Sequence, residues 1–424
     1  MPALSRPAPA ASQRDELASV LPVLRPVLDI IDTPVDTPVP PAWCETRGWS
    51  AFLLKLDDAA LFASERGGFA ALLAETPHAP AELRELAQQT ERCTALPTLA
   101  SPELALPVAA LRGVAARKQG QLRALLGALA PLAAHAERIV DVGAGRGHLS
   151  RLAAEFFQRE TLALDRNAAL LRSGGEQSDQ RAREVGALGV HFVHADVGQQ
   201  QLELQARDLA VGLHACGELG DRLVIAAGEA RCDLALVSCC LQKTSASRRL
   251  PLSRAALGLE LRRGALGLTN LTPRDEGVEA NMADNLRARE ARLALRYLLR
   301  ARGLSVSAGE EMRGVNRRRA QSGFADLAAH ALQLRQLAPP LPAELQQHGD
   351  AARRDHAAMR RLSLPRSLLA RLVELAVVRD RAAALEERGQ VVTVAQGFTS
   401  RVTPRNTVLF ASSSWDRLRT LGVV

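Results

Sequence analysis

Three glycines stand at alternate positions in one short loop of the sequence, at Gly143, Gly145 and Gly147. They follow an apolar segment that ends near Asp141, and an amphipathic segment begins at His148 directly after them. Glycine has no Cβ, so this loop can turn tightly and let a ligand approach its backbone closely. The order of strand, glycine-rich loop and helix therefore predicts a ligand-binding loop at the end of a strand.

Two further acids follow at the ends of predicted strands. Asp165 lies 18 residues after Gly147, where a carboxylate can accept hydrogen bonds from both hydroxyls of a ribose. Asp196, followed by Val197, ends the next strand, where an acid can receive an adenine amino group. Together with the glycine loop, these acids place polar groups at the ends of three successive predicted strands.

This pattern resembles the cofactor site of class I S-adenosylmethionine (SAM) methyltransferases, in which G-x-G-x-G follows an acid at a strand end. A nicotinamide-dinucleotide fingerprint would read G-x-G-x-x-G, and here His148 stands where its third glycine belongs. A degenerate Rossmann-like domain that binds no cofactor is the alternative. The resemblance implies that SAM is bound by Asp141, Gly143, Gly145, Gly147, Asp165, Asp196 and Val197.

One histidine and three cysteines follow the next two predicted strands. His214 and Cys216 leave the fourth strand and Cys239 and Cys240 leave the fifth, and ligands bind outside the carboxyl ends of such strands. Methyl transfer requires a positioned acceptor, and a histidine can serve as its base. We predict that these four residues line the methyl-transfer pocket. A purely structural role and a zinc site are the alternatives, although adjacent cysteines are poorly spaced for tetrahedral chelation.

Four segments resemble a particular branch of these enzymes. Residues 211–219 and 237–240 resemble the fourth- and fifth-strand motifs of the methyltransferase-like protein twenty-five family and of related tRNA 2′-O-methyltransferase-type domains. Residues 116–119 resemble the lysine-containing helix start of that family, and residues 402–406 resemble its Ser-Pro-Arg-Asn segment. The resemblance covers roughly residues 110–424.

The same segments also depart from the family. Thr403 replaces the serine before Pro-Arg-Asn, and Gln242 and Lys243 follow the double cysteine where an aromatic residue is common. These departures leave the substrate open. Lys118 and Lys243 are two of only three lysines in the chain and both lie beside motif segments. Either ammonium group can meet the SAM carboxylate or a substrate phosphate, or remain a plain surface lysine.

A parallel sheet is needed to position these residues. After residue 138, short apolar segments alternate with helical ones at intervals typical of βαβ units. We predict an α/β fold: a Rossmann-like class I methyltransferase sheet with a helical N-terminal region and a helical insertion before the last strands, at about residues 245–385. The predicted strands are Arg138–Val142, Thr161–Leu164, His191–Ala195, Leu209–Leu213, Leu234–Ser238, Gln390–Ala395 and Thr407–Ala411.

The chain is predicted to have three parts. Residues 1–42 form a Pro/Ala-rich, partly disordered N-terminus in which Pro22 ends one short helix. Residues 43–110 form a helical N-terminal region, and residues 111–424 form the methyltransferase domain, which includes the insertion.

Basic residues gather in one segment. The whole chain has a net charge of +8, whereas residues 242–320 alone carry 17 basic and 8 acidic side chains, a net charge of +9. Such a segment can attract a polyanion, and Arg317, Arg318 and Arg319 can contact phosphates, although a solvated helical surface explains the charge equally well. Because the resembled family includes tRNA-modifying members, RNA (tRNA or rRNA) is the favoured acceptor.

Composition limits the remaining choices. Hydrophobic residues make up 47% of the 424 residues and charged residues 24%, which excludes wholesale disorder. The longest apolar stretch, 124–134, is too short to span a membrane, and six cysteines are no disulfide framework, so we expect a reducing cytoplasm. No bound metal is expected. The alternatives to an RNA methyltransferase are a protein or small-molecule methyltransferase and a catalytically silent, SAM-binding protein-interaction module.

Overall fold

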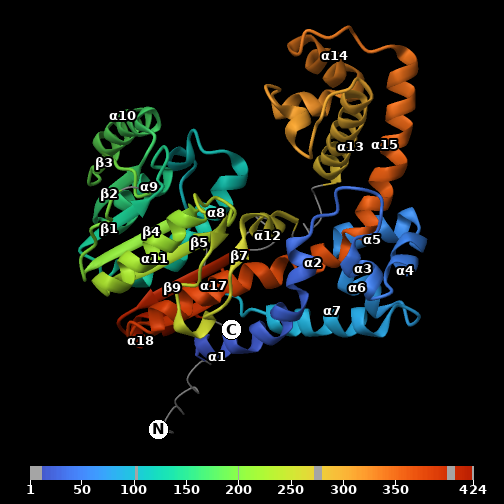
Figure 1. The fold of residues 1–424 in the computed structure, drawn as a ribbon. Coiled ribbons are helices and arrows are strands. Elements are labelled where there is room, and N and C mark those ends of the chain that lie inside the picture. The colour runs from blue at the N-terminus through green and yellow to red at the C-terminus, as the bar shows by residue number, and fades with distance from the viewer. Residues whose placement is uncertain (1–11, 101–103, 199, 272–278, 399–405, 423–424) are drawn as a thin grey trace. The chain divides into compact units, whose positions relative to one another are not determined.

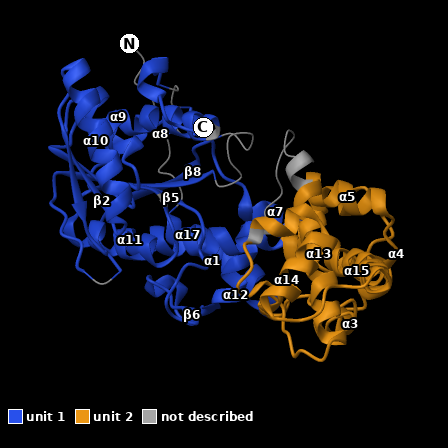
Figure 2. Ribbon diagram, turned by 90° about the horizontal axis from the view of Figure 1, so that it is seen from above, with its two compact units in different colours: residues 1–28, 88–272, 369–424 blue, residues 29–87, 273–368 orange. Residues whose placement is uncertain are grey.

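The structure is a computed structural model that describes residues 12–100, 104–198, 200–271, 279–398 and 406–422. Some side chains within these ranges, including those of His214 and Arg317, lie outside the description. The chain divides into two compact units (Figure 2). Unit 1 comprises residues 1–28, 88–272 and 369–424, and unit 2 comprises residues 29–87 and 273–368.

Unit 1 contains a seven-stranded sheet in the order β3-β2-β1-β4-β5-β9-β8 (Figure 1). The first five strands are parallel, whereas β9 runs antiparallel to both β5 and β8. The predicted α/β class and all seven predicted strands are confirmed. The strands are β1 (Arg138–Val142), β2 (Glu160–Asp165), β3 (Val190–His194), β4 (Asp208–Ala215), β5 (Asp233–Ser238), β8 (Val391–Gln396) and β9 (Thr407–Ser412).

Both faces of this sheet are covered by helices, which explains why its central strands, such as β5, are almost entirely buried and apolar. Successive side chains point to opposite faces, so Ile139 belongs to one core cluster and Val140 to the other. The helices that pack on the Ile139 face are α8 (Ala116–Ala133), α9 (His148–Phe157) and α18 (Trp415–Arg419). Those on the Val140 face are α11 (Glu218–Ala230) and α17 (Ala370–Glu386).

The strand order reverses between β1 and β4. The chain moves outward from β1 through β2 to β3, then returns to place β4 and β5 on the other side of β1. The loops that leave β1 and β4 therefore diverge, and ligands of open α/β sheets bind in the crevice at such a point. Helix α10 (Ala168–Val185) connects β2 to β3 within the outward half.

The N-terminal helix differs from the prediction that Pro22 would end it. Helix α1 (Gln13–Leu24) continues through Pro22 and packs along α17. Its side chains Leu17, Val20 and Leu24 are fully buried, and their burial offsets the backbone hydrogen bond that a proline cannot make. The remaining elements of this unit include β6 (Arg248–Arg249), β7 (Leu261–Arg262) and α12 (Arg263–Leu266).

Unit 2 is helical in its described part. An ion pair between Arg360 and Glu65 joins its two sequence segments. Helix α7 (Ala81–Thr94) crosses the boundary to unit 1, and α2 (Leu28–Asp32) begins at the other boundary. The other helices are α3 (Ala42–Thr46), α4 (Ser50–Lys55), α5 (Asp58–Gly67), α6 (Phe69–Ala74), α13 (Glu279–Ala301), α14 (Phe324–Leu334), α15 (Pro342–Leu362) and α16 (Leu364–Leu368). Among the described residues of the whole chain, no helix has the length and apolarity needed to cross a bilayer.

Candidate functional site

The three loop glycines all adopt left-handed backbone conformations, with φ of 79° at Gly143, 60° at Gly145 and 66° at Gly147. A Cβ at Gly147 would lie 2.5 Å from the Phe192 ring, so there is no room for a side chain at this position. A Cβ at Gly145 would have no heavy atom within 4 Å. The structure thus leaves open space over the middle of the loop, as the sequence pattern predicts for a ligand-binding turn.

Asp165 at the end of β2 is held by the loop. Its carboxylate accepts hydrogen bonds from the backbone N–H of Gly145 and from that of Asn167, both at 2.8 Å and one on each oxygen. A carboxylate has about four lone-pair sites, so each oxygen keeps one for a further donor. The two remaining sites suit the two hydroxyls of a ribose.

A cavity of about 790 Å³ opens beside this carboxylate, at the carboxyl ends of the first four strands. This volume falls in the range of small-molecule sites. The sequence-predicted residues that line the cavity are Gly143, Asp165, Asp196, Val197 and Cys216. The two acids predicted to hold the ribose and the adenine thus line one cavity, as an adenosine-containing cofactor such as SAM would require.

The other predicted cofactor residues, Asp141, Lys118, Gly145 and Gly147, are not among the residues that line the cavity. Asp141 is buried and accepts a 2.7 Å hydrogen bond from the Ser150 hydroxyl. Burial raises the pKa of Asp141 to about 6, although the Ser150 hydroxyl and the Lys118 ammonium oppose this shift. Burial, with Lys118 as the next cause, lowers the pKa of His148 to about 4. Direct cofactor contact by Asp141, Lys118, Gly145 or Gly147 stays a prediction.

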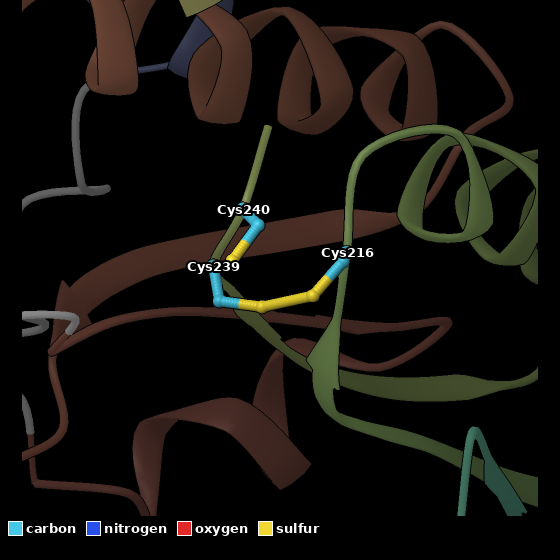
Figure 3. Close-up of side chains that lie close together, drawn as sticks. All are labelled: Cys216, Cys239 and Cys240. Carbon is cyan, nitrogen blue, oxygen red and sulfur yellow. A yellow bond between two sulfur atoms is a disulfide. The ribbon is translucent and has the colours of Figure 1, made fainter. Parts of the chain in front are cut away.

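The three predicted cysteines do come together (Figure 3). Cys216 follows β4, Cys239 and Cys240 follow β5, and their sulfur atoms all lie within 4.8 Å of one another. Cys216 and Cys239 form a disulfide, a single bond that the sequence analysis did not predict. Cys216 lines the cavity. His214 lies where the pairing of β4 with β5 shifts register, and its pocket role stays a prediction because its side chain is outside the description.

One wall of the cavity was not predicted from the sequence, except for Lys243, whose position beside a motif segment was noted. It is formed by the first turn of α11 and by the loop after β5, including Glu218, Arg222, Lys243 and Ser245. The backbone and hydroxyl of Ser245 donate to the Glu218 carboxylate at 3.0 and 2.7 Å. These hydrogen bonds and one from Arg222 hold the pKa of Glu218 below its usual value. The signal that could have found this wall is an acid directly after Gly217 at a strand end.

A buried arginine fixes the strand ends that carry the cysteines. Arg381 of α17 is fully buried and donates to the Gly217 carbonyl at 2.8 Å and to the Ser238 hydroxyl at 2.7 Å. Its Nε donates to Asp221 at 2.8 Å. Arg249 completes the network by pairing with Asp221 and Asp380. Local sequence patterns cannot reveal Arg381, because its partners lie at least 143 residues away.

The basic segment 242–320 is less available than its net charge suggests. Many of its arginines pair with acids inside their own unit, and the buried Glu311, for example, takes both Arg292 and Arg296. Arg319 pairs with Asp326, and the side chain of Arg317 lies outside the description. Arg318 is exposed. The interpretation of this segment as a phosphate-binding surface therefore stays a proposal.

The C-terminal motif is described only at its last residue. Thr403, Pro404 and Arg405 lie outside the described residues. Asn406 is buried, and its side-chain oxygen accepts a 3.2 Å hydrogen bond from Arg371.

Residues 117–247 match a family model described as a methyltransferase domain. This segment holds the glycine loop, both acids and the cysteine cluster. This segment is therefore similar to a methyltransferase domain. The domain's parallel strands β1 to β5 and its cavity agree with this assignment. No curated protein matches the sequence.

Solved structures share limited similarity with the chain. Phosphoethanolamine N-methyltransferase 1 of Haemonchus contortus is 18% identical over 27% of this chain and 24% of its own, with a TM-score of 0.20. A geranyl diphosphate methyltransferase in complex with SAM is 18% identical over 43% of this chain and 59% of its own, with a TM-score of 0.20. The [4+2]-cyclase SpnF is 15% identical over 78% of this chain and 94% of its own, with a TM-score of 0.27. The chain spans less than two thirds of the length of the first two.

Proposed function

We propose that this protein transfers the methyl group of SAM to an acceptor bound beside Cys216. The observation that carries the proposal is the single cavity that brings together Asp165, Asp196 and Cys216 from the ends of three different strands. When bound, SAM supplies an electrophilic methyl group on a sulfonium. Everything else required is positioning, which accounts for large rate enhancements when two reactants are held in line.

The residues of the chain divide this work between them. Asp165 accepts the ribose hydroxyls with the lone pairs left by Gly145 and Asn167, and Asp196 accepts the adenine amino group. Arg222 and Lys243 add positive charge to the cavity wall, which favours a carboxylate or phosphate there. His214 is the proposed base for an acceptor that must lose a proton.

The acceptor that we propose is RNA. Two observations support it: the resemblance of residues 211–219 to a family with tRNA-modifying members, and the excess of arginine in residues 242–320. Exposed arginines there, such as Arg263 and Arg318, remain able to meet phosphates. The paired arginines described above reduce the strength of the second argument, so a protein or small-molecule acceptor is the alternative.

An acceptor assay tests the proposal. Purified protein is incubated with methyl-labelled SAM and, separately, with total cellular RNA, protein extract and a small-molecule extract. We expect label in the RNA, and none with the Asp165→Ala variant. Label in the protein or small-molecule fraction would retain the methyltransferase and overturn the RNA acceptor. Tight SAM binding without transfer to any fraction would favour the silent, protein-interaction module.

A further inference from the structure

We propose that Cys216, Cys239 and Cys240 form a Zn²⁺ site once the disulfide between the first two is reduced. This inference rests on the positions of the sulfur atoms and does not depend on methyl transfer or on the identity of the acceptor. Three of the six cysteines of the chain converge here from the ends of two strands, and Cys216 and Cys239 are 23 residues apart in the sequence.

The three sulfur atoms lie close enough together to bind one metal ion, although the adjacency of Cys239 and Cys240 in the sequence argued against a zinc site. All three lie within 4.8 Å of one another. Tetrahedral zinc with Zn–S bonds of about 2.3 Å places its sulfur ligands about 3.8 Å apart, so small rotations of the side chains are sufficient. Figure 3 shows the sulfur of Cys240 directed back toward Cys239, on the side where the disulfide lies.

The cluster is held by the fold and does not depend on the disulfide. Strands β4 and β5 pair in parallel up to Ala215 and Ser238, the residues that precede Cys216 and Cys239. Arg381 bonds both strand ends, through Gly217 and Ser238. The backbones therefore stay adjacent after reduction, and a preformed site loses less conformational entropy when it binds an ion.

The other cysteines contrast with this cluster. Burial raises the pKa of Cys44 to about 11 and that of Cys232 to about 12, so neither supplies a thiolate near neutral pH, and only thiolates bind zinc strongly. Cys216 and Cys240 are half-buried, and Cys216 lines the cavity. Three protein ligands leave one position of a tetrahedral ion for water or an exogenous ligand, as in zinc sites that bind substrates.

The two states of the cluster exclude each other. A disulfide sulfur carries no thiolate, so the S–S bond must break before the ion binds. A phosphine reductant can break this bond. The phosphine is oxidised to the phosphine oxide with the oxygen of one water molecule, and each sulfur takes one of the two hydrogens of that water to become a thiol. Coordination of Zn²⁺ then releases the thiol protons to solvent.

Metal titration of the full chain tests the site. The protein is reduced with a phosphine, freed of metal, and titrated with Zn²⁺ against a chromophoric chelator. We expect about one equivalent to bind, with X-ray absorption showing three sulfur ligands at about 2.3 Å. Each of Cys216→Ser, Cys239→Ser and Cys240→Ser lowers the affinity at least about tenfold. Cys93→Ser is the matched control, since Cys93 is a half-buried thiol outside the cluster, and it binds Zn²⁺ as the wild type does.

Three results would overturn the proposal. The first is a Cys216–Cys239 disulfide that resists the reductant in the folded protein, which would make it a structural crosslink. The second is a reduced wild type that binds no Zn²⁺. The third is Cys240→Ser with unchanged affinity. Spectra of the wild type decide the matter even if a variant misfolds, because sulfur ligation is measured there directly.

Discussion

The guanidinium of Arg381 donates a hydrogen bond to the carbonyl oxygen of Gly217, 2.8 Å away, although 164 residues separate them in the sequence. Position 217 requires glycine, because its φ of 52° is left-handed and a Cβ there would collide with the Lys243 carbonyl. The contact links α17 to the turn that carries Cys216 and begins α11. A helix near the C-terminus therefore shapes a cavity made by the centre of the chain.

Replacing Arg381 by methionine should destabilise unit 1 by about 3–5 kcal/mol, because it leaves Asp221, whose side chain is only 15% exposed, with one fewer cation. Arg381 and Arg249 together hold the pKa of Asp221 below its usual value even though burial would raise it. Arg254→Met is the control: Arg254 is 83% exposed and pairs loosely with Glu387, so its loss should change stability by no more than about 0.5 kcal/mol. Urea denaturation of both variants makes the comparison, and equal midpoints would refute the positioning role of Arg381.

Gly145 and Gly186 form a matched pair for testing the loop. Both are left-handed, with φ of 60° and 64°, and neither would bring a Cβ within 4 Å of another heavy atom. Alanine at either position should therefore cost a similar ~1 kcal/mol of stability. Only Gly145→Ala should weaken SAM binding, since Gly186 ends α10 away from the cavity. If the two variants bind SAM with equal affinity, the loop does not approach the cofactor.

Asp141 and His148 should have opposite effects on stability between pH 4 and pH 6. The folded state holds the Asp141 proton up to about pH 6, whereas the unfolded state releases it near 3.8, so this group makes stability fall as pH rises. His148 takes a proton near pH 6.5 when unfolded and near 4 when folded, so it makes stability rise with pH.

Asp141→Asn removes only the first of these effects. The free energy of unfolding of the variant should therefore increase more steeply with pH than that of the wild type, and the difference between the two should change by about 1–3 kcal/mol from pH 4 to pH 6. Denaturant titrations at several pH values measure this difference. A parallel pair of pH profiles would show that the Asp141 carboxyl has an ordinary pKa in the folded protein.

The ion pairs of unit 2 indicate which arginines are available to bind RNA phosphates. Arg318 is exposed, whereas Arg319 already pairs with Asp326. If RNA is the acceptor, its affinity should fall steeply with salt, by about 0.7–0.9 log units per phosphate contact for each log unit of salt. Arg318→Gln should reduce the slope by about the contribution of one phosphate contact, and Arg319→Gln should reduce it less. Binding that does not respond to salt would remove the reason to prefer RNA.

Periodicity and spacing were sufficient to predict the sheet. Strand β1 and helix α9 are each recognisable within a dozen residues, because a strand buried on both faces and a helix with one apolar face have distinct patterns. The same reasoning located Asp165 and Asp196, since parallel strands present their carboxyl ends at one edge of the sheet.

Contacts between distant segments could not be predicted in this way. The contacts of Arg381 and the pairing of Arg360 with Glu65 in unit 2 join residues whose neighbours in sequence carry no sign of the partner. The approach of Cys216 to Cys239 was predicted from the strand ends, but the bond between them was not. Helix α1 shows the same limit, because burial against α17 decides that it continues through Pro22, and no local propensity reports that burial.

A calorimetric titration with SAM tests the central claim most directly. The wild type should bind one SAM per chain, and NAD should neither bind at micromolar concentration nor displace it, because the third glycine comes too early for a dinucleotide. Asp165→Ala should weaken SAM binding at least about tenfold, as expected for loss of hydrogen bonds to a charged group, while Asp179→Ala, an exposed acid on α10, should bind as the wild type does. Saturable NAD binding that SAM does not compete away, or equal SAM affinity of the folded Asp165→Ala variant and the wild type, would contradict the account.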